Sequence, residues 1–445
     1  MTRRRSGGLL ALIALSVLVL VAGACAPGQV ETQGPAGAAA SPPSAASLDP
    51  ASFRGKTLNY VYFTDGPDEQ ATRDLIAAFQ EETGATVNLQ IVPFGELQAS
   101  LQARLSGGNV PDVARLTDIN PFRDELLDLR QYLGADYASE FLSGPVSAVT
   151  GADGALLAVP SDLTMNGPLV NVDMFSEAGV DLPTADDTWT FDEMVAAAEE
   201  VQAANETDFA LALDFSGHRV STILSQYGTT LIGPDGKEAL DPAKAEQALQ
   251  VLADLMEEDK LSRDFWLQSG TRYTGANEIF LAGAAPLYLS GNWQVAALGD
   301  TAEFDWAAVP NPCVERCGGF PGGKFMAAFK RSANPDLAAY FIEWTNQAEN
   351  QTTFVQEALF LPTRNDLAES GVDYPTNSED MNVFLSDVAE TPEDTYATVA
   401  SPAFGPSANA LRDELAKVVA GQQDVPTAVQ NIKTQVAQFV EEAGG

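Results

Sequence analysis

The chain has 445 residues, of which 45% are hydrophobic and 8% aromatic, enough for a packed core and for more than one domain. It carries 62 acidic against 24 basic residues, which gives a formal net charge of −38. The negative electrostatic field of such a charge repels nucleic acid and anionic lipid headgroups. No basic run occurs beyond the first five residues, so the composition excludes a nucleic-acid-binding protein.

The first 24 residues have the pattern of a signal peptide. Three arginines at positions 3–5 precede a continuous apolar stretch at 9–22, and small residues lead to Cys25. A cysteine after small residues resembles the lipobox of bacterial lipoproteins, although Ala22 stands where that family prefers Leu or Val. The resemblance implies that Cys25 is acylated and anchors the mature chain to the cell membrane, outside the cytoplasm. The alternative is a plain secretory signal in which Cys25 has no role.

Residues 25–54 are rich in Gly, Ala, Ser and Pro and are predicted to form a flexible tether. No later apolar run is long enough to cross a bilayer. A lipid anchor followed by a tether suits a domain that works near a membrane surface without entering it.

Strands and helices then alternate along the chain. Strands are expected at 57–63, 86–92 and 111–116, and amphipathic helices at 68–84 and 95–108. This alternation predicts a parallel sheet with right-handed crossover connections.

The second half of the chain contains more helix. Thr190 and Glu193 form a capping box that predicts the start of a helix. Asp241 and Asn334, each followed by proline, predict two further helix starts. Apolar residues at helical spacing predict two last helices, separated at Gly421.

The stretch "AAPLYLSGNWQ", residues 284–294, combines a short strand with a tryptophan. Residues 284–289 are predicted to form the strand and residues 290–292 a turn. Trp293 then stands where a strand end meets a loop, a position that is more often wet than buried. A large aromatic ring at such a position calls for an explanation.

Two further cysteines, Cys313 and Cys317, lie close together and are predicted to form a disulfide in an exported chain. The loop is small, so the chain-entropy argument gives about 2 kcal/mol. His218 is the single histidine and there is no Cys/His cluster, so no metal site is expected. No Gly-rich phosphate loop or G-x-S-x-G elbow is present, and no cofactor is expected.

Several segments in chain order resemble one family, the extracellular solute-binding proteins of bacterial ABC importers, in its maltose-binding-protein-like carbohydrate branch. The resemblance runs from residue 55 to the end. Each segment by itself is weak evidence for the family, but their occurrence in the family's order behind a lipobox is specific to it. The segments are "GGNVPDV", "DELLDL", "DGALLAVPSD…LVNVDMFSEAGVDLP…TWTFDEMVAAAEEV", "IFLAGAAPLYLSGNW", "ENQTTFVQEALFLPTR" and "GQQDVPTAVQNI".

The resemblance implies an α/β fold of the type II periplasmic-binding-protein class, with two discontinuous lobes, a hinge and an interlobe cleft. Lobe 1 is expected to comprise residues 55–162 and 323–361, and lobe 2 residues 163–322 and 362–445. The glycines of "GGFPGGKF" either serve the hinge or only allow a tight turn beside the disulfide. We place the hinge crossings near residues 159–164, 321–326 and 361–363.

A sugar site combines an aromatic ring, which covers the C–H face of the sugar, with polar groups for its hydroxyls. Trp293 falls on the family's Gly-x-Trp position, where the ring stacks on ligand; the alternative is core packing. Polar contacts are expected at the carboxyl ends of strands, and the alternative for each carboxylate is a helix cap or a solvated face. The candidate ligand residues are Thr64, Asp65, Arg115, Asp118, Asp162, Phe215, His218, Trp293 and Gly322.

The predicted function is therefore non-catalytic. The protein is expected to capture a sugar or oligosaccharide as a monomer, to close around it, and to deliver it to ABC permease subunits. One alternative is a secreted glycosidase, which needs paired carboxylates across a sugar site. Another is a binding protein for a solute other than a sugar.

Overall fold

The computed structural model describes residues 49–151 and 153–444. The predicted signal peptide, Cys25 and most of the predicted tether lie outside these residues. The predicted tether extends to residue 54, but Pro50–Phe53 forms a 3-10 helix (η2) whose Phe53 is buried, with its ring centroid 5.1 Å from that of Tyr340. Burial of this ring makes residues 50–53 part of the packed structure. No helix within the described ranges is long and apolar enough to cross a membrane.

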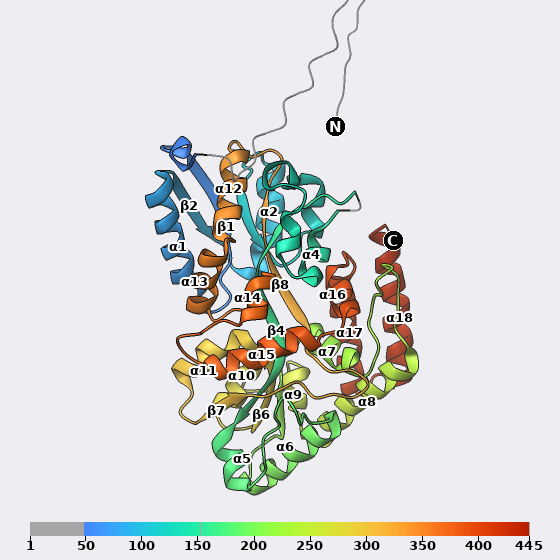
Figure 1. Ribbon diagram of the computed structural model, residues 1–445. Coiled ribbons are helices and arrows are strands. Elements are labelled where there is room, and N and C mark those ends of the chain that lie inside the picture. Colours follow the sequence, from blue (N-terminus) through green and yellow to red (C-terminus); the bar gives the residue numbers. More distant parts are fainter. Residues whose placement is uncertain (1–48, 152, 445) are drawn as a thin grey trace, which may run out of the picture. The chain divides into compact units, whose positions relative to one another are not determined.

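One eight-stranded sheet runs through the described part of the chain, in the order β2-β1-β3-β8-β4-β6-β5, with β7 paired to β4 (Figure 1). The strands β1, β2 and β3 are parallel, as the alternation of elements predicts, whereas β8 is antiparallel to β3 and β4. The strands are β1 (Thr57–Tyr62), β2 (Thr86–Ile91), β3 (Val113–Leu116), β4 (Val159–Asn171), β5 (Leu211–Leu213), β6 (Leu287–Gly291), β7 (Trp306–Ala308) and β8 (Pro321–Ala328).

Helices connect and cover these strands. The α-helices are α1 (Asp68–Thr83), α2 (Leu97–Ser106), α3 (Arg130–Leu133), α4 (Ser143–Val149), α5 (Val172–Ala178), α6 (Phe191–Asn205), α7 (Gly217–Gln226), α8 (Pro242–Glu257), α9 (Arg263–Trp266), α10 (Ala276–Leu281), α11 (Val295–Thr301), α12 (Pro335–Thr345), α13 (Ala348–Ala358), α14 (Asn365–Ser370), α15 (Ser378–Glu390), α16 (Glu393–Ala400), α17 (Phe404–Val419) and α18 (Val425–Glu442). Short 3-10 helices are η3 (Phe94–Glu96), η4 (Asn120–Glu125), η5 (Tyr137–Glu140) and η6 (Asn292–Gln294).

Local sequence signals explain where the clearest helices begin and end. The helix α1 stops at Gly84, which adopts a left-handed conformation with φ +68°. The helix α6 begins with the predicted capping box, in which the Glu193 carboxylate accepts a 2.8 Å hydrogen bond from the Thr190 N–H while the Thr190 hydroxyl accepts one from the Glu193 N–H.

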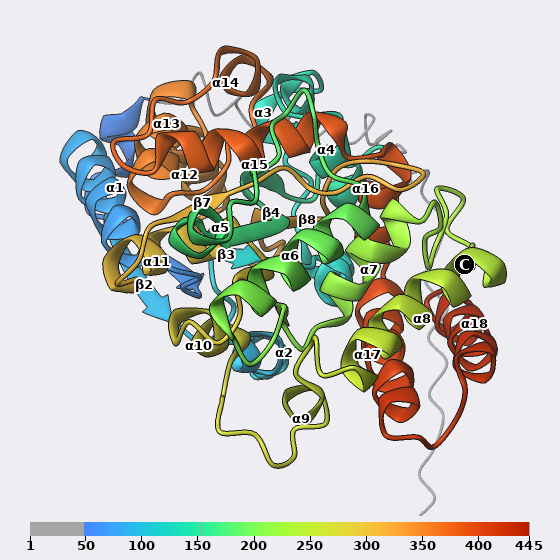
Figure 2. The same ribbon diagram turned by 90° about the horizontal axis from the view of Figure 1, so that it is seen from below.

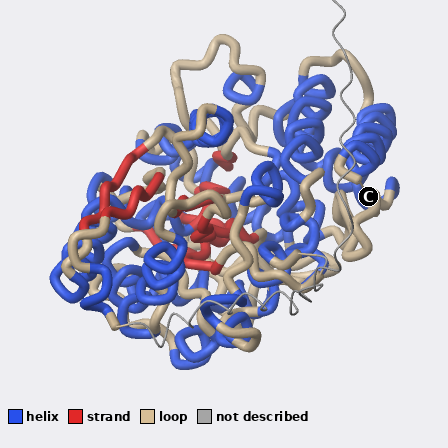
Figure 3. The backbone as a smooth tube through the Cα atoms, turned by 90° about the horizontal axis from the view of Figure 1, so that it is seen from above, coloured by secondary structure: helices blue, strands red, loops and turns tan. Residues whose placement is uncertain are grey.

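Two hydrophobic clusters form the cores on either side of the sheet's midpoint. The first gathers buried side chains of β1, β3, α1 and α12, and the second those of β4, β5, β6 and α8. Figure 3 shows most helices outside the strands, and Figure 2 shows α17 beside α18 and α15 across β4 and β7. Within the described residues there are therefore two cores, and β4 contributes side chains to both of them.

The segments expected to form the hinge crossings are neighbours in the sheet. The first part of β4 pairs with β8, its later part pairs with β6 and β7, and all thirteen of its residues are buried. Leu361 exchanges two backbone hydrogen bonds with Leu163, of 2.9 and 3.1 Å. Hence the three segments that the sequence places at the hinge lie side by side in the structure.

Two local predictions have different outcomes. The predicted turn at 290–292 is wrong in its first two residues, because Ser290 and Gly291 extend β6 and pair with Gly167 and Asn166 of β4. The chain turns only at η6. The disulfide between residues 313 and 317 is present, as expected.

Candidate functional site

The carboxyl ends of strands from the two halves of the sheet face each other near the hinge. We call each of these two sets of strand ends an edge of the site. Asp65 follows β1 and Asp118 follows β3, which is parallel to β1. In the other half, Asp214 follows β5 and Trp293 follows β6, and these strands are also parallel. The two edges meet where a Cβ atom on Gly66 would lie 3.9 Å from the Trp293 carbonyl oxygen. We call the region around Asp65 and Trp293 the interlobe site.

Lys324, on the crossing strand β8, provides a buried cation at this site. Its Nζ lies 2.5 Å from Asp65 Oδ2, 3.5 Å from Thr164 Oγ1 and 4.9 Å from the centre of the Phe360 ring. Burial on its own would raise the pKa of Asp65, but the charge and hydrogen bond of Lys324 outweigh it and lower that pKa. Asp65 is therefore ionised at neutral pH, and its side chain remains 36% exposed to accept hydrogen bonds.

Arg219, near the start of α7, supplies the second cation. Its Nε donates to Asp214 Oδ2 at 3.0 Å, its Nη1 donates to Asn166 Oδ1 at 2.8 Å, and its guanidinium carbon lies 4.1 Å from the centre of the Trp293 ring. Asp214 also accepts hydrogen bonds from the hydroxyls of Tyr288 and Ser290. The guanidinium is thus fixed over one face of the tryptophan.

Trp293 is half-buried, and the structure explains its Gly-x-Trp pattern. A Cβ atom on Gly291 would lie 2.1 Å from the tryptophan ring, so only glycine leaves room for it. Between the two, the Asn292 side chain accepts a hydrogen bond from the Met165 N–H and donates one to the Leu359 carbonyl. The turn that carries the ring is therefore hydrogen-bonded to β4 and to Leu359, the residue that follows α13.

Arg115 and Asp162, both expected to contact ligand, are instead buried and paired with each other. Arg115 Nη2 lies 2.7 Å from Asp162 Oδ2, and its Nη1 lies 2.9 Å from Asp68 Oδ2 and 3.0 Å from the Phe63 carbonyl oxygen. The side chains of the ion pair are 1% and 0% exposed. A burial this complete is inconsistent with ligand contact, so these residues hold the loop after β1 against the hinge.

Asp118 and Gly322 also have local roles. Asp118 accepts hydrogen bonds from the backbone and side-chain N–H groups of Asn120, at 2.8 and 2.6 Å, and so forms an Asx-turn just before η4 while remaining exposed. Gly322 lies opposite Thr164 in the β4–β8 ladder, where a Cβ atom would lie 2.5 Å from the threonine hydroxyl. Its glycine is explained by this close approach.

The two aromatic candidates of the second half lie at the ends of α7 and β5. His218 packs edge-to-face against Phe404, with centroids 4.8 Å apart, and burial followed by the charge of Arg219 lowers the pKa of His218 to about 4. It is therefore neutral at pH 7. Phe215 packs edge-to-face against Trp266, with centroids 5.1 Å apart, and the Arg412 guanidinium lies 4.9 Å from the centre of its ring.

The structure thus brings Asp65, which follows Thr64 in the chain, close to Trp293, and adds Arg219 and Lys324, which the sequence did not single out. The sequence did contain a signal for these two residues, because basic residues are rare in the chain, 24 in 445. Arg219 directly follows the candidate His218, and Lys324 directly follows the glycines of a predicted crossing.

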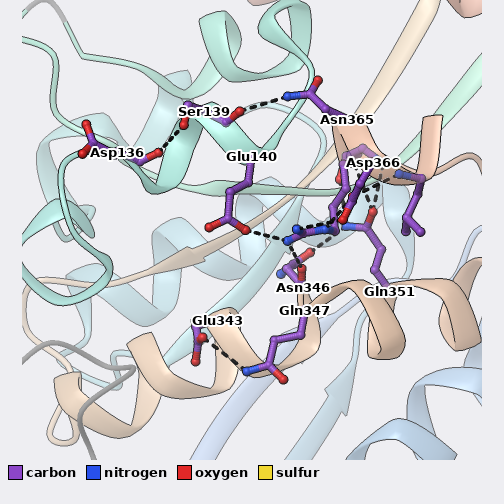
Figure 4. A network of polar contacts seen from close by, with 12 residues as sticks. Asp136, Ser139, Glu140, Glu343, Asn346, Gln347, Gln351, Asn365 and Asp366 are labelled. Carbon is purple, nitrogen blue, oxygen red and sulfur yellow. Dashed lines mark hydrogen bonds and ion pairs between the residues drawn. The ribbon is translucent and has the colours of Figure 1, made fainter. Parts of the chain in front are cut away.

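The third crossing is held by a polar network (Figure 4). The side-chain oxygen Oε1 of Gln351 accepts from the backbone N–H of Thr363, and the Thr363 hydroxyl donates to the Pro160 carbonyl at 2.8 Å. Arg364 donates to Glu140 at 2.8 Å and to the Asn346 carbonyl at 3.2 Å. Arg364 therefore connects the third crossing to the end of η5 and to the end of α12.

A hollow of about 720 Å³ lies between α4 on one side and α14, α15 and α16 on the other, away from the interlobe site. Leucine, valine, alanine and proline side chains make up much of its wall, and no lysine or arginine lines it. The interlobe site, with two cations and an aromatic ring, offers more of the groups that a sugar needs.

Comparison with known proteins gives consistent matches. Residues 74–381 match the family described as bacterial extracellular solute-binding protein. A putative binding protein of Brucella abortus (strain 2308) is 22% identical over 358 residues, covering 77% of this chain and 83% of that protein. The diacetylchitobiose binding protein DasA of Streptomyces coelicolor is 25% identical over 315 residues, covering 65% and 69%.

Solved structures share the fold. The GacH receptor of Streptomyces glaucescens, known unliganded and with acarbose, superposes with a TM-score of 0.74 at 19% identity, covering 87% of this chain and 99% of the receptor. The maltose-bound MalE3 of T. maritima superposes with a TM-score of 0.70 at 18% identity, covering 86% and 99%. The predicted two-lobe α/β fold is therefore confirmed.

Proposed function

Since the chain belongs to the bacterial extracellular solute-binding proteins, we propose that it captures a sugar or oligosaccharide at the interlobe site and delivers it to the membrane subunits of an ABC importer. The observation that carries the proposal is the meeting of Asp65 and Lys324 from one edge with Arg219 and Trp293 from the other. A ligand that contacts both edges stabilises the closed arrangement.

The chemistry of these groups suits a neutral, hydroxyl-rich ligand. Each cation has its own carboxylate partner, so the site offers donors and acceptors without a large net charge. Sugar hydroxyls can both donate to the carboxylates and accept from the cations. The names of the relatives, which include binders of acarbose, maltose and diacetylchitobiose, support the same class of ligand.

Binding fits these residues better than glycoside hydrolysis does. A glycosidase needs a carboxylic acid that is protonated near neutral pH and can donate to the leaving oxygen. Asp65 has a lowered pKa because of its lysine partner, so it is held in the ionised form. Its role in this proposal is to accept hydrogen bonds.

The place of action follows from the family and from the N-terminal sequence. An extracellular solute-binding protein works outside the cytoplasm, where its permease can reach it. We further propose that Cys25 carries the lipid anchor and that the protein acts as a monomer. The signal-peptide pattern and the lipobox-like cysteine support the anchor.

A thermal-unfolding screen over mono- and oligosaccharides, including maltose, maltotriose, acarbose and diacetylchitobiose, tests the proposal. A sugar at one hundred times its dissociation constant should raise the free energy of unfolding by about 2.7 kcal/mol. Chromatography of the same mixtures should return each sugar unchanged. Hydrolysis of a sugar, or stabilisation by a solute of another class and by no sugar, would contradict the proposal.

A further inference from the structure

Phe94 is an aromatic side chain that is largely exposed to solvent. Among the described residues, three large hydrophobic side chains are exposed: Phe94 at 61%, Val314 at 44% and Ile91 at 38%. Exposure of a phenylalanine is unfavourable, because burying its apolar surface would stabilise the protein. Neither core uses this ring, so its exposed face is available to a ligand.

The position of Phe94 places it at the first edge of the interlobe site. It follows β2, which pairs in parallel with β1 so that Ile91 lies opposite Tyr62, and the Val92 N–H donates to the Tyr62 carbonyl at 2.8 Å. Phe94 therefore leaves the sheet at the same edge as Asp65. Strand β2 is the outermost strand on this side of the sheet.

The ring is held on one side by the protein. Its centroid lies 5.2 Å from that of Phe63, which is 1% exposed and itself packs against the Arg115 guanidinium at 4.9 Å. A flat ring fixed on one side and open on the other is the arrangement that receives the apolar face of a sugar. Trp293, the other aromatic ring of the site, has Arg219 over one of its faces.

The order of the strands places Phe94 on the outer side of Asp65. Along the sheet the order is β2, β1, β3, β8, β4 and β6, and the Lys324 side chain from β8 reaches Asp65, with its Nζ 2.5 Å from Oδ2. Phe94 leaves the next strand outward from Asp65, one strand spacing of about 4.8 Å away. Because Trp293 follows β6 in the other half of the sheet, a ring bound between Asp65 and Trp293 lies on the inner side of Asp65, and the outer side, where Phe94 lies, remains open to a second ring.

We propose that Phe94 is the apolar platform of an outer subsite, and that the ligand is an oligosaccharide of at least two rings. One ring lies between Asp65, Lys324 and Trp293, and the next stacks on the exposed face of Phe94. Phe94 then determines specificity for chain length. This inference rests on the proposed function and names its substrate class.

The test compares oligosaccharide and monosaccharide binding in variants of the full mature protein. An array of α- and β-linked mono- to hexasaccharides first identifies the oligosaccharide that binds most tightly; calorimetry then measures it and the monosaccharide from each of its ends. Phe94→Ala should weaken the oligosaccharide at least tenfold and change a monosaccharide less than twofold. Phe94→Tyr should retain affinity because it keeps the ring, whereas Phe94→Leu should not. Val314→Ala, which removes another exposed apolar side chain, is the matched control and should change neither.

The unfolding midpoint of Phe94→Ala without sugar should equal that of the parent, because the ring is exposed. Oligosaccharide affinity that is unchanged in Phe94→Ala, an equal loss for both sugar lengths, or preference for a monosaccharide would overturn the inference and leave the proposed function standing. Absence of binding to any saccharide of the array would overturn both.

Discussion

The guanidinium carbon of Arg219 lies 4.1 Å from the centre of the Trp293 ring, and the side chains of Asp214 and Asn166 hold it there. A cation over an aromatic face contributes from about 0.5 kcal/mol when exposed to about 2 kcal/mol when desolvated. A sugar that stacks on this face must displace the arginine. Trp293 and Arg219 therefore act as one unit, in which the ring supports a donor as well as offering its own surface.

Trp293→Ala should weaken sugar binding tenfold to a hundredfold, or about 1.4 to 2.8 kcal/mol, because it removes apolar contact and the support of Arg219. The ring is half-buried, so the loss of stability should be below the roughly 3 to 5 kcal/mol of a buried tryptophan. Trp344→Ala, at a buried tryptophan, is the control and should show that full loss. Calorimetry and denaturant unfolding measure the two effects. Unchanged affinity together with a full loss of stability would assign Trp293 to the core.

Arg219→Lys should weaken sugar binding by about tenfold with little change in the unfolding midpoint. Lysine keeps the charge but cannot bond Asp214 and Asn166 together while lying flat on the ring. The control is Arg272→Lys, which alters an exposed arginine 4.8 Å from the Tyr273 ring and should have no effect. Equal affinities of Arg219→Lys and the parent would show that the guanidinium geometry is irrelevant to the ligand.

Arg115→Met should reduce the free energy of unfolding by about 3 to 5 kcal/mol, because it leaves the carboxylates of Asp68 and Asp162 buried without their cation. Arg130→Met, at a partly exposed pair with Asp128, should cost about 0 to 1 kcal/mol. Urea denaturation compares the two variants. A stable Arg115→Met protein that had lost only its sugar affinity would restore Arg115 to the ligand site.

His218 should make stability depend on pH between its folded and unfolded pKa values, near 4 and 6.5. In that window the unfolded chain binds more protons, so its contribution is complete above pH 6.5 and is lost as the pH falls towards 4. Over the whole window, His218 should reduce the free energy of unfolding by about 3 kcal/mol. Burial raises the pKa of Asp387 to about 7, which acts in the opposite direction and makes stability fall as pH rises towards 7.

The difference between the parent and His218→Gln isolates the histidine, since Asp387 is common to both. Urea denaturation at pH 7, 6 and 5 should show the parent losing more stability than the variant. Because His218 is the single histidine of the sequence, no other imidazole contributes to the pH dependence. Parallel pH profiles would mean that His218 is as accessible to protons as in the unfolded chain.

Cys25 should be the acylated N-terminus of the mature protein. Processing should therefore be sensitive to globomycin, and the protein should partition into detergent. Cys25→Ser should abolish both properties and leave sugar binding unchanged, since the residues of the interlobe site begin at residue 64 of the sequence. A mature chain that begins at another residue and stays in the aqueous phase would refute lipidation.

The sequence by itself determined the local elements and the family. The helices α6 and α8 are capped by Thr190 and Asp241 as predicted, because a cap is made within one turn: the Asp241 carboxylate accepts from the N–H groups two and three residues later. The parallel pairing of β1 with β2 follows from strand–helix alternation. The ordered motifs were sufficient to place the chain among solute-binding proteins.

Only the tertiary structure decided what each polar side chain does. Asp65 and Asp162 both end up beside a cation, yet the first stays 36% exposed at the interlobe site while the second is buried. Arg115 meets its two carboxylates across 47 residues on either side. The role of a charge depends on its partner and on the water left around it, and both are set by contacts between segments far apart in the chain. Spacing along the sequence carries no record of those contacts, so it located the edge of the site without separating the groups that can contact a ligand from those that hold the fold.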